Sequence, residues 1–261
     1  MNVSRIVSLV PSLTETVCEL AAGDRLVGVT RYCVEPEATL QGVPRVGGTK
    51  NPDREKIAAL QPDIILANTE ENRAEDIHWL KKNFLVMESA PTTVAEAAAL
   101  VRDLGQILEA REEAETILLL IEAQLARAEV ESLDREAIRV FYPIWKKPWM
   151  TINGNTYIHD ILERAGAVNV AADRPDRYPT IDPSEFRGLR VELVLLPDEP
   201  WVFDEQHRQE LVACGWFDAP ILLVDGKDFS WHGARTGPGL GRVTDLLVAH
   251  RLRGGEPLPG Q

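Results

Sequence analysis

The sequence has few cysteines, few aromatic residues and no long apolar run. Its three cysteines, Cys18, Cys33 and Cys214, show no CxxC spacing, so neither a zinc site nor a thioredoxin-like redox motif is expected. An odd number of cysteines in a chain of this size does not suggest a disulfide framework, and we expect reduced thiols in an intracellular protein. No apolar run is long enough to cross a membrane, so we expect no membrane insertion.

Positive charge is also scarce. The chain has 28 Lys and Arg against 41 Asp and Glu, which gives a formal net charge of -13. The longest basic run is Lys146-Lys147. A chain of this charge repels nucleic acid and anionic membrane surfaces. We therefore expect no nucleic-acid partner.

The N-terminus lacks the features of a signal peptide. MNVSRIVSLVPSLTE has no apolar core of signal-peptide length and no small-residue cleavage site, and the strand-like IVSLV begins almost at once. We therefore expect a cytoplasmic protein. The alternative is a periplasmic or extracellular protein whose signal has been removed.

Common catalytic motifs do not occur. The sequence has no GxSxG, HExxH or GxxxxGK[ST]. GPGLG at 237–241 does not directly follow a strand within a βαβ unit, so we do not interpret it as a dinucleotide loop. The adjacent carboxylates of Glu70-Glu71 and of Asp198-Glu199 are typical of solvated loop tips. No catalytic residue, cofactor or bound metal is therefore predicted.

Short apolar runs alternate with helical patterns through most of the chain. This alternation is typical of βαβ units and predicts an α/β fold with mostly parallel sheets. Ser12, with Glu15 three residues later, predicts a capping box at the start of the first helix. The predicted strands cover 5–10, 26–30, 45–48, 63–68, 84–89, 137–143, 191–197 and 221–226.

A long helical pattern divides the chain. Residues 93–133 contain no proline and one glycine, Gly105. About forty helical residues span on the order of 60 Å, so this helix either breaks near Gly105 or bridges two lobes. A coiled coil is the alternative, but the heptad is not sustained. Because the second half repeats the pattern of the first, we predict two α/β lobes, 1–92 and 134–261, joined by a backbone helix over 93–133.

The loops after the predicted strands combine aromatic and cationic side chains. Aromatic rings offer flat contact area at low entropy cost, and arginine donates directional hydrogen bonds to carboxylates, phosphates or amide oxygens. In two lobes of this kind the loops at the strand ends line a cleft, so we predict a site for a bulky, partly apolar ligand there. The candidates are Tyr32, Trp145, Trp149, Tyr178 and Trp231, flanked by Arg31, Lys146, Lys147 and Arg235.

His232 lies in the last of these loops, within DFSWHGAR. It could ligate a metal or a metallated cofactor. No second histidine or carboxylate stands at ligand spacing on a predictable element, which favours a hydrogen-bonding loop histidine. Ser12, in the loop after the first strand, and Thr49, in the loop after 45–48, complete the candidate contacts.

The chain resembles the substrate-binding proteins of ABC importers for cobalamin and ferric siderophores. IVSLVPSLTETVCELAAGDRLVGVTRYCVEPEA, VPRVGG and REKIAALQPDIILAN carry the resemblance, and TINGNTYIHDILERAGAVNVA resembles the start of that family's second lobe. The resemblance covers about residues 4–250 and is more specific in its N-terminal part. It implies a two-lobed fold of the helical-backbone, class III periplasmic-binding-protein type. It also implies non-catalytic capture of cobalamin or another metal chelate in the interlobe cleft.

The cobalamin branch is the closer match. Tyr32 falls where that branch places a tyrosine against the corrin, and Trp231 and Arg235 fall in the last cleft loop. Thr49 stands where the cobalamin receptor has a tryptophan. Family members dock on their permease through a glutamate on each lobe. Here Ala74 and Ser184 align with those positions, and Glu75 and Glu185 are one residue away, which leaves the permease partner open.

Other functions remain as alternatives. A ferric siderophore or haem is the nearest alternative ligand, but only Arg31 and Arg235 are obvious partners for an anionic chelate, which favours a more neutral, flatter ligand such as cobalamin. A cytoplasmic relative acting as a sensor is another alternative. An enzyme using His232, His159 and Asp160 is a third.

Overall fold

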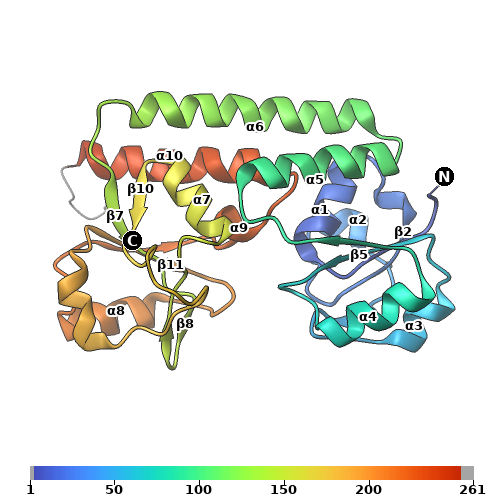
Figure 1. Cartoon of the computed structure of the whole chain (residues 1–261), viewed down its shortest axis with the longest axis horizontal. Helices are drawn as coiled ribbons and strands as arrows, with labels where there is room; N and C mark the ends of the chain where they lie inside the picture. Colours follow the sequence, from blue (N-terminus) through green and yellow to red (C-terminus); the bar gives the residue numbers. More distant parts are fainter. Residues whose placement is uncertain (1–2, 254–261) are drawn as a thin grey trace. The chain divides into compact units, whose positions relative to one another are not determined.

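The computed structural model describes residues 3–253, which form two compact units (Figure 1). Unit 1 holds the chain up to Pro91, together with Ala95–Ile121 and His232–Thr236. Unit 2 holds Thr92–Val94, Glu122–Trp231 and the residues from Gly237 onward. Each unit is therefore built from segments that are far apart in the sequence.

The first half of the chain alternates strands with helices, as predicted. Its elements in chain order are β1 (Ile6–Ser8), α1 (Pro11–Glu19), η1 (Gly23–Arg25), β2 (Leu26–Val29), α2 (Glu37–Leu40), β3 (Gly47–Gly48), β4 (Asn51–Pro52), α3 (Arg54–Ala59), β5 (Ile64–Asn68), α4 (Ala74–Asn83), β6 (Val86–Ser89), α5 (Val94–Ile107) and α6 (Arg111–Ser132).

The second half repeats this alternation. Its elements are β7 (Ile138–Phe141), β8 (Trp145–Lys146), β9 (Trp149–Met150), α7 (Tyr157–Arg164), β10 (Ala167–Asn169), η2 (Pro183–Leu189), β11 (Leu193–Pro197), α8 (Glu205–Cys214), β12 (Ile221–Val224), α9 (Lys227–Ser230) and α10 (Thr236–Leu252).

The two units contain parallel sheets with the same strand order. Within the described residues, the sheet of unit 1 has the order β2-β1-β5-β6 and that of unit 2 has the order β10-β7-β11-β12. Neighbouring strands in both sheets are parallel. Two antiparallel hairpins, β3–β4 and β8–β9, lie outside the sheets. The predicted α/β class and the internal repeat are confirmed.

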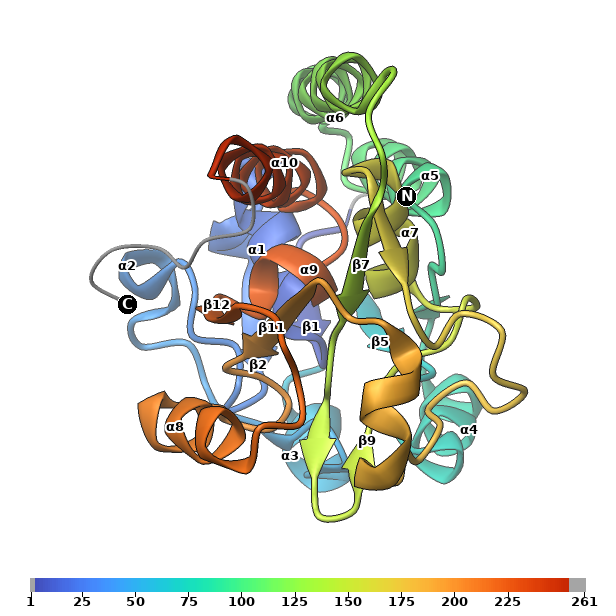
Figure 2. The ribbon, with the colours of Figure 1, turned by 90° about the vertical axis from the view of Figure 1, so that its left-hand side faces the viewer.

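The sheet of unit 1 is buried on both faces. Ile6 of β1 packs in a cluster with residues of α1 and α5, whereas its neighbour Val7 packs on the other face with residues of α3 and α4. Figures 1 and 2 show these helix pairs on opposite sides of the strands. Successive strand side chains point to opposite faces, so a sheet covered on both sides needs a continuous apolar run such as IILA in β5.

The predicted backbone helix is two helices. α5 ends at Ile107, and Glu109 has a left-handed φ of 57° before α6 begins at Arg111. Gly105 permits the close return of the chain, because a Cβ there would overlap the Cβ of Ala114 and lie 3.1 Å from the Ala110 carbonyl oxygen. Of the two possibilities left open by the sequence, the helical pattern does break near Gly105. α6 also carries the chain from unit 1 to unit 2, because the boundary falls between Ile121 and Glu122.

The prediction for the start of the first helix is wrong. Ser12 is not an N-cap: α1 begins at Pro11, its N-cap is Val10, and no side chain caps it. Proline is favoured at the first helical position because its missing N–H would have had no partner there. The last helix begins at Thr236 and so includes GPGLG. Gly239 allows close packing, because its Cβ would lie 2.6 Å from the carbonyl oxygen of Asp228.

We predict that Gly105→Ala destabilises the protein by about 1–3 kcal/mol, because the added methyl overpacks the contact with Ala114. Gly188→Ala is the matched control, since a Cβ at Gly188 would meet nothing within 4 Å. Urea unfolding followed by circular dichroism measures both. Equal stability of the two variants would contradict the role given to Gly105.

Candidate functional site

Each sheet has a point where the chain changes its winding direction. The chain leaves β1 for β2 on one side and later returns to β5 on the other, and β7 has the same relation to β10 and β11. In parallel α/β sheets, ligands bind beyond the carboxyl ends of the strands at such a point. The loops after β1 and β5 in unit 1, and after β7 and β11 in unit 2, are therefore candidate site loops. The loops after β2 and β10 leave the same carboxyl edges of the neighbouring strands and are included with them.

Two asparagines hold the loops of unit 1. Asn72 Nδ2 donates to the carbonyl oxygens of Leu9 (3.3 Å) and Thr49 (2.9 Å), and Asn72 Oδ1 accepts from the backbone N–H of Asn68. Asn68 Oδ1 accepts from the backbone N–H of Glu70 at 2.7 Å. One buried amide thus joins the loops after β1, β3 and β5. No periodic pattern or motif marks these asparagines in the sequence.

A buried hydroxyl and thiol cluster fixes the loop after β2. The Sγ of Cys33 lies 3.1 Å from the Oγ1 of Thr14 and 3.1 Å from the Oγ1 of Thr30. Arg45 donates to the carbonyl oxygens of Thr30 and Cys33. Burial raises the pKa of the Cys33 thiol, so it stays protonated and unreactive. The cluster holds the backbone from which Tyr32 projects.

The predicted residues of unit 1 differ in exposure. Tyr32 is 54% exposed, and the guanidinium of Arg31 lies 5.6 Å from its ring centroid. Arg31 also donates to Asn51 Oδ1 at 3.1 Å. Ser12 is buried, and Thr49 is half-buried. Tyr32 therefore offers an accessible ring beside a cation, whereas the side chain of Ser12 does not reach solvent.

The segment His232–Thr236 belongs to unit 1 and is held there by Arg235. The Arg235 guanidinium donates to both Glu15 oxygens and to Glu35, with its closest contact at 2.5 Å. The backbone N–H of Ala234 donates to Thr16 Oγ1 at 3.0 Å. Arg235 is thus engaged in ion pairs that hold its own segment to α1. Its predicted contact with a ligand stays untested.

His232, three residues before Arg235, is buried and is not an accessible base. Burial lowers its pKa to about 4, so the imidazole is neutral at neutral pH. Its suggested partners in an enzyme, His159 and Asp160, lie in unit 2. Asp160 Oδ2 accepts from the backbone N–H of Val94 at 2.7 Å and so caps the start of α5. This contact accounts for Asp160 structurally.

DFSW was expected in a loop, but its first three residues lie in the short helix α9, and two acidic residues after β11 hold this segment. Asp198 Oδ1 accepts from the backbone N–H of Gly226 at 2.8 Å, and Glu199 Oε1 accepts from Ser230 Oγ at 2.6 Å. Glu199 also accepts a hydrogen bond from the side chain of Trp231. Trp231 is only 7% exposed, and Lys227 Nζ lies 5.4 Å from its ring centroid. Contacts with Asp198, Glu199 and Lys227 therefore hold this segment within unit 2.

The other aromatic candidates of unit 2 fall into two groups. Trp145 and Tyr178 are each 38% exposed. Trp149 is 8% exposed and packs against Phe186, Phe203 and Trp216 in the core of unit 2. Such packing is what a core aromatic shows, so the accessible rings of unit 2 are those of Trp145 and Tyr178.

Trp201 packs against one of the predicted aromatics, Trp145, although it was not itself predicted as a ligand contact. It follows β11, and its ring centroid lies 4.7 Å from that of Trp145 in an edge-to-face arrangement. Its Nε1 is buried and makes no hydrogen bond within residues 3–253. Trp145 follows β7, so this pair stands at the winding change of unit 2. The signal was its place directly after Pro197-Asp198-Glu199-Pro200.

Both units carry an exposed tyrosine next to an arginine. Tyr178 has the guanidinium of Arg177 5.8 Å from its ring centroid, as Tyr32 has that of Arg31. These pairs follow β10 and β2, which occupy the same position in the two sheets. Tyr32, Trp145 and Tyr178 are the large aromatic side chains exposed within residues 3–253.

The two docking candidates have different surroundings. Glu75 lies in the first turn of α4 with its side chain 70% exposed and 3.7 Å from Arg73. Glu185 belongs to a capping box with Asp182 and pairs with Arg174 at 2.5 Å. Glu75 is thus accessible to a partner, whereas the carboxylate of Glu185 is engaged locally.

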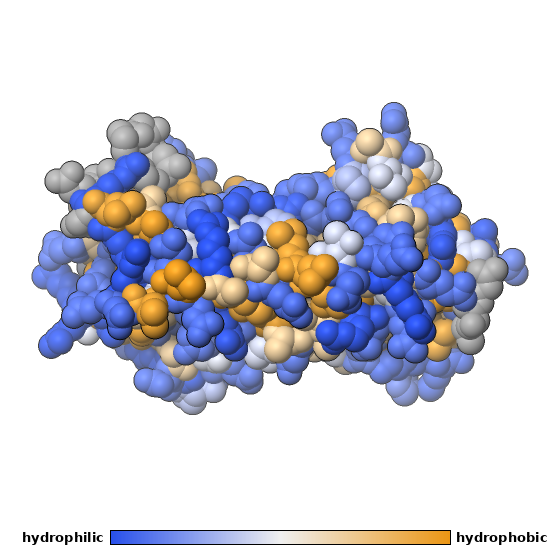
Figure 3. All heavy atoms as spheres, turned by 90° about the horizontal axis from the view of Figure 1, so that it is seen from above, coloured by the Kyte–Doolittle hydropathy of each residue, from blue (hydrophilic) through white to orange (hydrophobic). Residues whose placement is uncertain are grey.

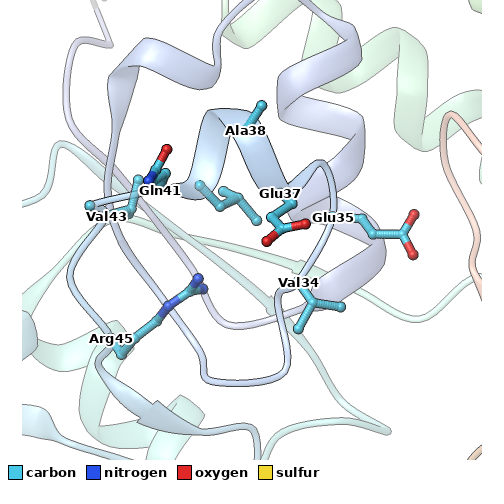
Figure 4. A pocket seen from close by; sticks show the side chains of 9 residues that line it. Val34, Glu35, Glu37, Ala38, Gln41, Val43 and Arg45 are labelled. Carbon is cyan, nitrogen blue, oxygen red and sulfur yellow. The ribbon is translucent and has the colours of Figure 1, made fainter.

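Unit 1 has a pocket whose lining contains none of the predicted ligand contacts. It has a volume of about 980 Å³ and is lined by Val34, Glu35, Glu37, Ala38, Leu40, Gln41, Gly42, Val43 and Arg45 (Figure 4). The Glu35 carboxylate points away from the other lining side chains in this view, consistent with its ion pair to Arg235.

The described part of the chain shows neither a metal-binding cluster nor a membrane-spanning helix. No group of three or more histidine, cysteine, aspartate or glutamate side chains in residues 3–253 is arranged to hold a metal ion. No described helix combines the length and apolarity needed to span a membrane.

We predict that the contribution of Glu199 to the free energy of unfolding falls as pH rises through its titration range. Burial raises the pKa of Glu199 above its ordinary value of 4.5, although the Ser230 hydrogen bond opposes this. The folded state therefore holds the proton more tightly than the unfolded state, and burying the carboxylate costs stability once pH exceeds the folded pKa. Glu199→Gln keeps an acceptor for Ser230 and should remove this loss.

Urea unfolding across a pH series measures the effect of Glu199→Gln. Glu205→Gln is the control of opposite sign, because Arg208 lowers the pKa of Glu205 to about 2 and the stability it contributes is lost toward acid. An unchanged pH profile in Glu199→Gln would show that Glu199 is not the group responsible.

Known proteins share this fold. The vitamin B12-binding protein of Vibrio cholerae serotype O1 is 26% identical over 204 residues, which cover 78% of this chain and 71% of that protein. The structure of the periplasmic vitamin B12 binding protein of Vibrio cholerae matches with a TM-score of 0.79 and 22% identity, covering 95% of this chain and 98% of that one. A periplasmic heme-binding protein from Roseiflexus sp. RS-1 matches with a TM-score of 0.81 and 20% identity, covering 95% and 99%.

A family model described as periplasmic binding protein matches residues 6–199. The resemblance drawn from the sequence is therefore confirmed. The expected cytoplasmic location is wrong, because the matching family is that of periplasmic binding proteins and both solved structures are of periplasmic proteins. Export signals are removed from mature proteins, so the first residues of a sequence do not decide the compartment. With most of its length matched, the chain belongs to the periplasmic binding protein family.

Proposed function

We propose that this protein binds a cobalamin-class corrinoid without transforming it and presents it to the permease of an ABC importer. The observation that carries the proposal is the pair of exposed tyrosines, each beside an arginine, on equivalent loops of the two units. The name of the Vibrio cholerae relative supports the choice of ligand.

The chemistry of these loops fits a large, flat ligand with amide groups. The rings of Tyr32, Tyr178 and Trp145 offer apolar area to a macrocycle. Arg31 and Arg177 carry donors suited to amide and phosphate oxygens. Cobalamin has amide side chains around its ring and one phosphate, so it offers acceptors for donors of this kind.

The surroundings of the candidate catalytic groups support binding without catalysis. The imidazole of His232 is buried, and Asp160 caps α5. Burial raises the pKa of the Cys33 thiol, which makes it a poor nucleophile. The permease partner rests on the family, and Glu75 is the accessible carboxylate for such a contact.

We expect cyanocobalamin to bind with micromolar or tighter affinity in calorimetric titrations. Haem and a ferric hydroxamate, titrated in parallel, are the competing ligands. Tighter binding of either would keep the fold and reassign the ligand. Silence with all three would overturn the proposed function.

We predict that Tyr32→Ala and Tyr178→Ala each weaken cobalamin binding by about 1–3 kcal/mol, because each removes an aromatic contact. Both side chains are exposed, so the free energy of unfolding should change by no more than about 0.5 kcal/mol.

Trp231→Ala is the contrast to the tyrosine variants. Its ring is buried, so this change should cost about 3–5 kcal/mol of stability. Parallel calorimetry and urea unfolding separate the two effects. Unchanged affinity in both tyrosine variants would remove these loops from the site.

A further inference from the structure

The helix α6 has two apolar faces, and only one of them is covered. Its inner face contains Ala114, Leu118, Ile121 and Ala128, each no more than 6% exposed. Its outer face carries Leu119, which is 56% exposed, and Val130, which is 69% exposed. A helix on the surface of a globular protein ordinarily has one apolar stripe and a polar opposite face. The outer face of α6 departs from that pattern.

The outer apolar residues form a regular stripe. They are Leu119, Ala123, Ala126, Val130 and Leu133, which are all exposed and follow one another at intervals of four and three residues. This is the spacing of side chains that meet a second helix in a coiled coil. Leu133 continues the stripe past the end of α6, because its N–H donates to the Glu129 carbonyl oxygen as in a helix. Figure 3 looks onto this face and shows apolar side chains in orange among hydrophilic ones.

One border of the stripe is acidic. Glu115, Glu122 and Glu129 recur there every seven residues, all exposed. None of these three carboxylates makes an ion pair within residues 3–253. The other border has Leu120, 41% exposed, and Arg127, whose guanidinium pairs with Asp245 of α10. The uncompensated charge along the stripe is therefore negative.

These charges decide between the kinds of partner. A second copy of this chain would bring the glutamate row against itself in an antiparallel pair of α6 helices. In a parallel pair the row would meet the border of Leu120 and Arg127, and Arg127 is already engaged by Asp245. Helices that lie on membranes carry lysine and arginine on their polar face, which α6 does not. A helix with basic residues beside an apolar stripe complements both features.

We propose that the outer face of α6, from Leu119 to Leu133, docks a basic amphipathic helix of a partner protein. Leucine-sized side chains of the partner would pack over Ala123 and Ala126, where the small residues leave room for close approach. Lysine or arginine of the partner would pair with Glu115, Glu122 and Glu129. The surface does not use the candidate ligand contacts, so it is independent of the proposed function.

The test uses the full chain and a synthetic helical peptide with leucine along one face and lysine on both sides of it. Fluorescence anisotropy of the labelled peptide should report saturable binding. Binding should weaken when salt is raised from about 50 to 500 mM, because exposed charges are screened. A matched peptide with glutamate in place of lysine should not bind. No binding of the lysine peptide, or equal binding of both peptides, would overturn the proposal.

Two variants of the chain locate the binding. Leu119→Asp combined with Val130→Asp should weaken lysine-peptide binding at least about tenfold, since central apolar contacts dominate such interfaces. Glu122→Gln combined with Glu129→Gln should weaken it less and reduce its salt dependence. Val212→Asp, at a 61% exposed valine of helix α8, is the matched control and should bind as the parent does. Weakening by Val212→Asp equal to that of the stripe variant would contradict a site on α6.

The competing occupants are measured directly. Sedimentation equilibrium of the chain alone should show no self-association that Leu119→Asp with Val130→Asp abolishes, and such self-association would overturn the proposal in favour of a second copy. Co-sedimentation with phosphatidylcholine and phosphatidylglycerol vesicles should show no binding that depends on the stripe. Stripe-dependent binding to either vesicle would assign the surface to lipid instead.

Discussion

Burial of the parallel sheet on both faces is the constraint on which the rest of unit 1 depends. Ile6 and Val7 pack into clusters on opposite faces, and every residue of β5 is buried. A strand in this position has no side chain to offer a ligand. Chemistry in such a unit has to come from the loops beyond the strand ends, and those loops need support of their own.

The loops obtain that support from polar side chains that the sheet cannot supply. Asn72 joins the loops after β1 and β3 through two carbonyl oxygens. After β11, Asp198 and Glu199 accept hydrogen bonds from Gly226 and Ser230. The cluster DFSWHGAR, which combines two aromatics, a histidine and an arginine, is mostly held by such contacts. Trp231 is bound by Glu199, and Arg235 is bound by Glu15 and Glu35. Residue types that suggest ligand contacts can thus serve to hold the fold together where they make contacts within the protein.

The helix α6 likewise has one face that packs in the core and one face that is exposed. Its inner face completes the core of unit 1 through Ala114 and Leu118, while Leu119, one residue further, is exposed. Apolar residues lie on both faces, so no simple amphipathic pattern marks the helix. The break at Glu109 and the close approach at Gly105 set where this helix begins.

The sequence by itself determined the α/β class, the repeat of strand and helix in two halves, and the family. Those properties follow from local patterns: apolar runs such as IILAN predict buried strands, and alternation with helices predicts parallel pairing. It also predicted Tyr32, Trp145 and Tyr178 as candidates, and these are accessible aromatics. Helix α8 was not predicted, because EQHRQELVAC has little apolar periodicity.

Only the tertiary structure decided which candidate side chains are free to meet a ligand. Trp145, Trp149 and Trp231 were all predicted to lie in loops that contact a ligand. Trp149 and Trp231 are instead buried, the first against Phe203 and the second beside Glu199. Ser12 was expected to cap α1, but the helix starts at Pro11 instead. The segment His232–Thr236 belongs to unit 1 through its contacts with α1. Exposure and ion pairing depend on residues distant in the chain, and no local pattern records them.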